Sequence, residues 1–343
     1  MKIEIITTPN EELKETGFGT LKACQNVLDS INKLGHDVKL NVCRSLEDLA
    51  LIVNRQPDLV ILAVKYISIN NCRDVWLSEY FAAHEINYSG SPRQVLRFDS
   101  DKVLAKSHLI KKGLKTANYF TAIPGQYKCE ADLPVAFPLF LKPLDAANGN
   151  GIDDLSLVTN FAEFETKMSS LYAAFNMPVL AEEYLDGKEF SVAIIKTEGS
   201  KLIVSAVEIV PPQSTKGLRI LGEKAKKEDS EEIKKIDDQI MLNKVKKLAV
   251  DAYTRLGIWD FGRIDIKTNK RGHCYFMEAN LVPGMTSGTS YFPRACEIAN
   301  GLSYDEVIQL IVEKGISRAP YAESLFIPTV IANNTGDKRV AVM

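Results

Sequence analysis

The chain has 343 residues, of which 45% are hydrophobic and 25% are charged. These are average values for globular proteins, so they exclude a disordered chain, a collagen and a coiled coil, and the length predicts two or three domains. The 42 basic and 44 acidic side chains nearly cancel, to a net charge of −2. Such a balance provides no field to hold a polyanion, and it argues against nucleic acid as a partner.

Three features of the sequence bear on its compartment. It contains no apolar run of about 18 residues, and its first 15 residues carry charges where a secretory signal needs an apolar core. The six cysteines are scattered without a CxxC pair, and the four histidines are isolated. We therefore expect a reduced, cytoplasmic protein with no membrane partner, and neither a histidine metal site nor a Ser-His-Asp triad.

Residues 1–95 alternate between strand and helix patterns. Short runs rich in Ile, Val and Leu predict strands, and apolar residues three or four positions apart predict helices. The predicted strands are 2–7, 36–42, 58–64 and 86–90, and the predicted helices are 20–35, 45–53 and 75–85. Strands that alternate with helices in this way predict a parallel sheet with both faces covered.

Beyond a basic helical region at 97–112, strand patterns dominate. The predicted strands are 138–144, 178–185, 188–196, 201–210, 259–268 and 273–281, and the predicted helices are 160–175, 240–257, 291–300 and 303–316. The turn NKRG at 269–272 suits a hairpin between the last two strands. The segment 211–238 has low hydrophobicity and many charges, and it is predicted to be a mobile loop that runs into a helix.

The densest group of chemical side chains lies on that predicted hairpin. Because side chains alternate along a strand, Arg263 and Asp265 share one face, and so do Glu278 and Asn280. A hairpin that joins the two faces would present two carboxylates, an amide oxygen and a guanidinium. Oxygen ligands are those that Mg²⁺ takes when it also holds nucleotide phosphates. Charges paired across a solvated sheet face are the alternative interpretation.

The loop that follows, PGMTSGTS at 283–290, combines glycines with hydroxyl groups. Gly284 permits a close backbone approach, so free N–H groups there would receive an anion or an oxyanion. An ordinary loop before a helix, with Thr289 or Ser290 as the N-cap, explains the same residues.

A lysine within an apolar strand marks a second candidate site. Lys142 is costly to bury without an anionic partner, and it precedes the loop DAANGNGI at 145–152. The N–H groups of that loop are suited to cover phosphates, although neither a Walker motif nor GxGxxG is present. A lysine on an edge strand beside a flexible turn is the alternative.

The segment EEYLDGKEF at 182–190 is a third candidate. Its acids are suited to the edge of an adenine and to ribose hydroxyls, while a simple hairpin turn explains the pattern equally well.

Taken together, these motifs resemble the ATP-grasp superfamily, and most closely the D-alanine–D-alanine ligase family. The matching features, in chain order, are Lys102, Lys142, EEYLDGKEF, Arg263, Asp265, Glu278, Asn280 and PGMTS. The most specific run is FMEANLVPGMTSGTSYFPRAC at 276–296. The resemblance implies a three-domain ATP-grasp fold of α/β and α+β class. Its expected parts are a Rossmann-like domain at 1–96, a lid domain at 97–185, a catalytic domain at 186–317 and a tail at 318–343 of unknown role.

The resemblance also implies a role for each matched residue. Those expected to bind ATP are Lys102 and Lys142 at the phosphates, Asn148, Gly149 and Gly151 in the phosphate loop, Glu182, Glu183, Tyr184 and Leu185 at the adenine, and Glu189 at the ribose. Asp265, Glu278 and Asn280 match ligands of one or two Mg²⁺ ions, with Mn²⁺ as an alternative. Arg263 and the Gly284 N–H match the groups that hold the acyl phosphate and the tetrahedral intermediate.

The matched residues imply an ATP-dependent carboxylate–amine ligase that works through an acyl phosphate. Its expected partners are small amino-acid-like carboxylates and amines, and the family implies a homodimer. The family's contacts to amino acids are altered here: Phe18 and Gly19 stand where the family has its ammonium-binding acid, with Glu15 upstream, and Thr289 and Ser290 replace a Ser-Leu pair. An altered substrate is therefore predicted. The alternatives are a catalytically reduced paralogue that acts as a nucleotide-binding regulator or scaffold, and a phosphotransferase that needs no amine.

Overall fold

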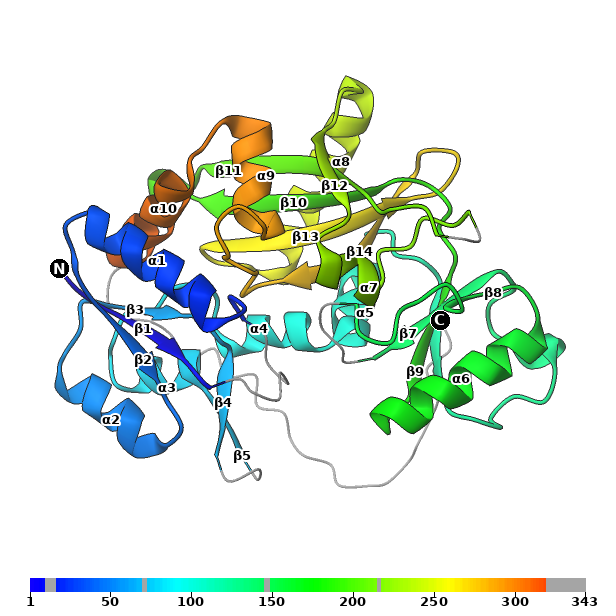
Figure 1. Cartoon of the computed structure of the whole chain (residues 1–343), viewed down its shortest axis with the longest axis horizontal. Helices are drawn as coiled ribbons and strands as arrows, with labels where there is room; N and C mark the ends of the chain where they lie inside the picture. The colour runs from blue at the N-terminus through cyan, green and yellow to red at the C-terminus, as the bar shows by residue number, and fades with distance from the viewer. Residues whose placement is uncertain (10–16, 70–72, 145–148, 215–216, 319–343) are drawn as a thin grey trace.

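The computed structural model describes residues 1–9, 17–69, 73–144, 149–214 and 217–318. Its strands form three larger sheets and one small hairpin. In Figure 1 the N-terminal sheet and the middle sheet lie at opposite ends of the molecule, with the largest sheet above them. In the described part of the chain, no helix is both long enough and apolar enough to cross a membrane.

The N-terminal sheet is parallel, as the alternating pattern predicts. Its strands, in the order β2-β1-β3, are β1 (Lys2–Thr7), β2 (Asp37–Val42) and β3 (Leu59–Leu62). The helices α1 (Leu21–Lys33) and α2 (Leu46–Asn54) connect them. The predicted strand at 86–90 is wrong, because that segment forms only a single bridge, between Val60 and Tyr88, before the chain turns at Gly90.

Two predicted helices of this region also differ from the structure. The strands β4 (Tyr66–Ile69) and β5 (Arg73–Trp76) pair antiparallel. The following helix, α3 (Leu77–Ala83), is therefore shorter than the predicted 75–85. The basic region at 97–112 is two helices, α4 (Arg93–Ser100) and α5 (Lys102–Lys111), because the extended backbone of Asp101 ends α4 and its side chain caps α5.

The middle sheet has the order β6-β9-β7-β8. Its strands are β6 (Tyr119–Ala122), β7 (Leu139–Pro143), β8 (Leu157–Val158) and β9 (Val179–Glu183). The helix α6 (Phe161–Phe175) covers it, and Phe120, Leu141 and Phe164 lie in a core of its own. This separate core makes the middle sheet a distinct packing unit.

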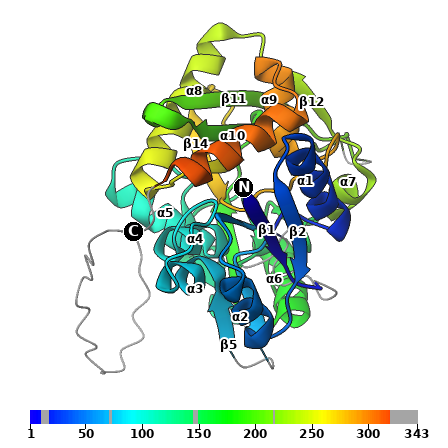
Figure 2. The ribbon, with the colours of Figure 1, turned by 90° about the vertical axis from the view of Figure 1, so that its left-hand side faces the viewer.

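The large antiparallel sheet has the order β12-β11-β10-β13-β14. Its strands are β10 (Glu189–Lys196), β11 (Leu202–Val210), β12 (Glu232–Lys235), β13 (Phe261–Thr268) and β14 (Cys274–Asn280), and α8 (Gln239–Leu256), α9 (Tyr291–Asn300) and α10 (Tyr304–Ser317) pack against it. In Figure 2 the helix α10 lies between this sheet and the N-terminal sheet, and it contacts both. One continuous apolar core, which includes Ile5, Phe190 and Phe276, joins the two.

The segment 211–238 contains more regular structure than the sequence predicts. It holds α7 (Glu223–Glu228) and β12, which pairs with β11. Its charged side chains mask the strand pattern, because only Ile233 of β12 is buried. The predicted loop thus contains a short helix and a strand before the predicted helix, α8, begins.

Candidate functional site

A cavity of about 620 Å³ lies between the middle sheet and the large sheet. Strands β7 and β9 contribute residues on one side, and β10, β13 and β14 contribute residues on the other. The predicted residues that line it are Lys102, Lys142, Gly149, Glu182, Glu183, Tyr184, Leu185, Glu189, Arg263, Asp265, Glu278, Asn280, Gly284, Thr289 and Ser290. Side chains that the sequence spreads over almost 190 positions thus converge on one space.

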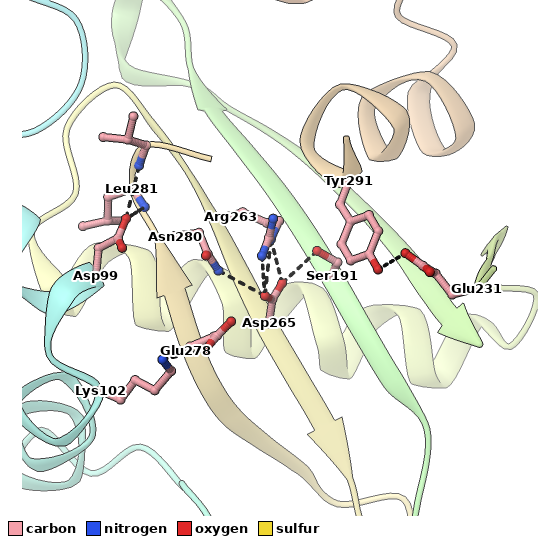
Figure 3. A network of polar contacts seen from close by, with 11 residues as sticks. Asp99, Lys102, Ser191, Glu231, Arg263, Asp265, Glu278, Asn280, Leu281 and Tyr291 are labelled. Carbon is pink, nitrogen blue, oxygen red and sulfur yellow. Dashed lines mark hydrogen bonds and ion pairs between the residues drawn. The ribbon is translucent and has the colours of Figure 1, made fainter. Parts of the chain in front are cut away.

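The β13–β14 hairpin brings its four polar residues together across the strands. Arg263 stands opposite Asn280, and Asp265 stands opposite Glu278. Arg263 forms an ion pair with Asp265 at 2.8 Å, and the Asn280 amide donates to the same carboxylate at 3.1 Å. Figure 3 shows these side chains on neighbouring strands, with Ser191 of β10 also donating to Asp265 at 2.8 Å. The expected face of carboxylates, amide and guanidinium is present.

Positive charge dominates the surroundings of Glu278. Burial acts to raise the pKa of this carboxyl, but Lys102, Lys226 and Lys142 outweigh burial and hold the pKa at about 2. The Lys102 ammonium lies 3.7 Å from the Glu278 carboxylate. Glu278 is therefore ionised at neutral pH, as a cation ligand or a phosphate-site carboxylate must be.

The hairpin residues fit a hard divalent cation by donor chemistry. Asp265 and Glu278 supply carboxylate oxygens from adjacent strands. Asn280 donates its amide nitrogen to Asp265, so its amide oxygen remains an acceptor. Within the described ranges, no cluster of three His, Cys, Asp or Glu side chains is arranged for a metal. The candidate cation ligands of the hairpin are therefore two carboxylates and one amide oxygen. They suit an ion that completes its coordination with oxygens of a bound molecule.

Lys142 is buried on strand β7, which lies between β9 and β8 in the order of the middle sheet and is therefore not an edge strand. The short β8 pairs only with Leu139 and Phe140, so among the described strands Lys142 itself pairs with β9 alone. The Lys142 ammonium lies 2.7 Å from one carboxylate oxygen of Glu182, and the Lys106 ammonium lies 2.7 Å from the other oxygen. Burial opposes ionisation of Glu182, but the two lysines lower its pKa to about 2. The Glu182 carboxylate is thus committed to two lysines, which leaves the other residues of its segment to face the cavity.

The other residues of the segment 182–190 that line the cavity are suited to bind a planar ring. Tyr184 stacks on Phe140 with ring centroids 6.4 Å apart, and both line the cavity. Glu189 begins β10 and forms an ion pair with Lys267 at 3.3 Å. The segment therefore combines an aromatic wall with a carboxylate at its far end.

The glycine loop lies against α7. A Cβ on Gly149 would approach the backbone of Gly222 to 3.1 Å, and the N–H of Gly151 donates to Glu223 at 3.3 Å. Gly151 itself does not belong to the lining. Asn148, the remaining predicted residue of this loop, lies outside the described residues, as does Glu15.

Hydrogen bonds to the Asp99 side chain anchor the start of the loop after β14. The Asp99 carboxylate accepts from the N–H groups of Leu281 and Val282 at 2.6 and 3.3 Å. Ser290 accepts from the Thr286 N–H and occupies the N-cap position of α9, although its side chain does not cap that helix. The loop is therefore a rigid cavity wall.

Several residues of the site carry no role predicted from the sequence, among them Lys106, Ser191, Glu231 and Tyr291. The sequence contains a signal for Ser191, because this polar residue interrupts the apolar run 190–195. In the structure it pairs with Asp265. Glu231 and Tyr291 are 60 positions apart, and no local pattern connects them.

The family model described as D-ala D-ala ligase C-terminus matches residues 110–313. The chain belongs to this family. The D-alanine–D-alanine ligase of Gloeobacter violaceus is 25% identical over 92% of this chain and 100% of its own length. That of Aquifex aeolicus is 26% identical over 91% of this chain and 100% of its own length.

Solved structures of the family have the same fold. The crystal structure of D-alanine–D-alanine ligase from Bacillus anthracis complexed with ATP is 20% identical and has a TM-score of 0.69, covering 92% of this chain and 97% of that chain. These similarities confirm the predicted family, the ATP-grasp fold class and the assignment as a carbon–nitrogen ligase.

Proposed function

We propose that this ligase joins a carboxylate to an amine through an acyl phosphate, with ATP bound between the middle and large sheets. The observation that supports this most is the convergence of Lys102, Lys142 and the β13–β14 polar face on one cavity. A reaction at phosphorus needs positioning and charge neutralisation more than it needs a protein nucleophile.

In this proposal ATP spans the cavity. Its adenine contacts the backbone of residues 182–185 beside Tyr184, and its ribose contacts Glu189. Its phosphates face Lys102 and Lys142, beside Gly149. The contributions of Asn148 and Gly151 to the phosphates stay predictions from the family resemblance. The ion pair between Lys142 and Glu182 positions the ammonium at the cavity wall, so little side-chain entropy is lost when a phosphate binds.

Asp265, Glu278 and Asn280 would hold one or two Mg²⁺ ions, or Mn²⁺. When bound, such an ion neutralises charge on the phosphates. Arg263, anchored by Asp265 and with its guanidinium 5.4 Å from the centre of the Tyr291 ring, is positioned to stabilise the oxygens of the reacting carboxyl. The backbone N–H of Gly284 supports the same oxygens.

The chemistry has two displacements. A carboxylate oxygen of the donor attacks the γ-phosphorus, the bond from that phosphorus to the β–γ bridging oxygen breaks, and ADP leaves. The amine then attacks the acyl carbon, phosphate leaves, and the nitrogen loses a proton to give the amide. Exclusion of water by the segment 211–238 would protect the acyl phosphate from hydrolysis.

We further propose that the substrates differ from those of the relatives, which are named for D-alanine. Phe18 is buried and lines the cavity where the family resemblance places an acid. Thr289 and Ser290 contribute at the second substrate, and Glu15 at the first. The domain boundaries at 96, 185 and 317, and the homodimer, belong to the same proposal.

A screen of ATP-dependent phosphate release against pairs of amino and hydroxy acids, with mass spectrometry of the product, tests the function. An amide product supports ligation. Phosphorylated product without amide indicates a phosphotransferase, and nucleotide binding without release indicates the regulator alternative. Phosphate release with D-alanine equal to that of an authentic D-alanine–D-alanine ligase would contradict the altered substrate.

A further inference from the structure

Glu231 and Tyr291 form a polar pair on the cavity wall that none of the proposed roles uses. The Tyr291 hydroxyl donates to one carboxylate oxygen of Glu231, and both residues line the cavity. Figure 3 shows the pair beyond Arg263, on the side away from Glu278. Tyr291 begins α9, whereas Glu231 immediately precedes β12, so tertiary packing alone creates the pair.

The charge of Glu231 is not compensated by any ion pair among the described residues. The side chain is 91% buried, since its exposed fraction is 9%. Its second oxygen, Oε2, lacks a hydrogen-bond partner in the described part of the chain. By contrast, four other carboxylates of the cavity each have a cation within 4 Å: Glu182, Glu189, Asp265 and Glu278.

The geometry also determines what Tyr291 offers to a ligand. Its only hydroxyl hydrogen is committed to Glu231, so the phenol oxygen can only accept a further hydrogen bond. Burial of Tyr291 raises the pKa of its hydroxyl, and the hydrogen bond to Glu231 and the charge of that carboxylate raise it further, which keeps the hydroxyl protonated. The pair therefore offers a hydrogen-bond acceptor, the Tyr291 phenol oxygen, next to the Glu231 carboxylate, whose charge no ion pair of the described residues compensates.

We propose that Tyr291 and Glu231 receive the ammonium group of a substrate, and that the substrate is an amino acid rather than a hydroxy acid. The ammonium donates to the phenol oxygen and compensates the Glu231 carboxylate. Arg263, on the other side of the Tyr291 ring, faces the carboxyl group of the same molecule. This inference rests on the proposed ligase function, and it places ammonium recognition at the start of α9 and at the residue before β12, in place of the altered position at Phe18.

The test compares three single variants. Glu231→Gln removes the charge but keeps an oxygen that accepts from Tyr291. Tyr291→Phe removes the acceptor. Glu232→Gln is the matched control, because Glu232 is the adjacent residue but its side chain is 67% exposed. Each protein, loaded with Mg²⁺ and a non-hydrolysable ATP analogue, is titrated in a calorimeter with amino acids and their hydroxy analogues, from glycine and glycolate to D-alanine and D-lactate.

We expect the unmodified protein to bind at least one amino acid about tenfold more tightly than its hydroxy analogue, as a charge-assisted hydrogen bond predicts. Glu231→Gln and Tyr291→Phe should reduce that preference to about threefold or less, while Glu232→Gln retains it. A preference that survives Glu231→Gln overturns the proposal. Failure of every amino acid to bind the unmodified protein overturns it as well.

Thermal unfolding without ligand supplies an independent readout. A buried carboxylate without compensation is unfavourable, so Glu231→Gln should leave the melting temperature unchanged or raise it. A lower melting temperature together with unchanged amino-acid preference would assign the pair a structural role only. Phosphate release is measured separately: release with an unchanged preference in Glu231→Gln refutes this inference and leaves the ligase function standing. Ammonium-selective binding without release refutes the ligase function instead.

Discussion

The most quantitative prediction concerns Glu182, which lies between two lysines in the middle sheet. Glu182→Gln leaves the ammonium groups of Lys106 and Lys142 buried without an anion, 2.7 Å from a neutral amide. The pKa of Glu182 falls from 4.5 to about 2 in the folded protein. At about 1.4 kcal/mol per pKa unit, this corresponds to roughly 3 kcal/mol of stability. Loss of one partner of a buried ion pair costs a similar amount, about 3–5 kcal/mol.

The pH dependence has a definite sign. Because folding lowers the pKa of Glu182, its contribution is complete above the unfolded value of 4.5 and is lost as the pH falls toward about 2. We therefore expect the stability difference between the unmodified protein and Glu182→Gln to be about 3 kcal/mol at pH 7. It should be smaller by about 1 kcal/mol at pH 3.5.

Equilibrium urea unfolding, followed by circular dichroism, measures both differences. Glu183→Gln is the matched control on the same strand: its half-buried carboxylate accepts from Asn118 and has no lysine partner among the described ion pairs, so its loss should cost less than about 1 kcal/mol. Adding Lys106→Met to Glu182→Gln should recover part of the loss, because it removes the more deeply buried ammonium. A cost below about 1 kcal/mol for Glu182→Gln at pH 7 would refute this account of the lysine pair.

Three further predictions concern the proposed reaction. Asp265→Asn and Glu278→Gln should each lower Mg²⁺-dependent phosphate release by roughly 100-fold while nucleotide binding without Mg²⁺ is retained; unchanged release would favour the regulator alternative. Mg²⁺-ATP with substrate should protect residues 211–238 from limited proteolysis, and equal cleavage with and without them would contradict closure. Gly222→Ala should raise the KM for ATP severalfold, because the new Cβ would lie 2.5 Å from the Ile152 carbonyl oxygen and displace α7 from the glycine loop. Steady-state kinetics measures this effect, and an unchanged KM would exclude it.

Local patterns were sufficient where neighbouring residues determine the geometry. The alternation of Arg263 with Asp265, and of Glu278 with Asn280, requires only a strand period of two and a turn at 269–272. The structure has the predicted hairpin, and it pairs Arg263 with Asn280 and Asp265 with Glu278. The parallel N-terminal sheet likewise follows from strands that alternate with helices.

Predictions failed where pairing with another segment overrode the helix or strand preference of the residues themselves. Residues 86–90 are apolar enough for a strand, but only Tyr88 bridges to the sheet. Residues 75–76 have helix-compatible neighbours, yet they pair with 66–67 in a hairpin. Strand β12 has one buried residue, Ile233, so its pairing with β11 leaves almost no hydrophobic signal. For residues 86–90 and for β12, the contact that decides the structure lies outside the window in which a periodicity can be detected. For residues 75–76, a neighbouring strand competes with the helix pattern.

By itself, the sequence determined the family, the ligase fold class and the short-range geometry of the β13–β14 residues, because these depend on motif order and strand alternation. Only the tertiary structure decided that Glu182 is held between Lys106 and Lys142, and that Glu231 meets Tyr291 with its charge uncompensated. The physical reason is that burial and partner choice depend on which distant segments pack together. Whether a buried charge stabilises or destabilises the fold depends on which partners lie beside it.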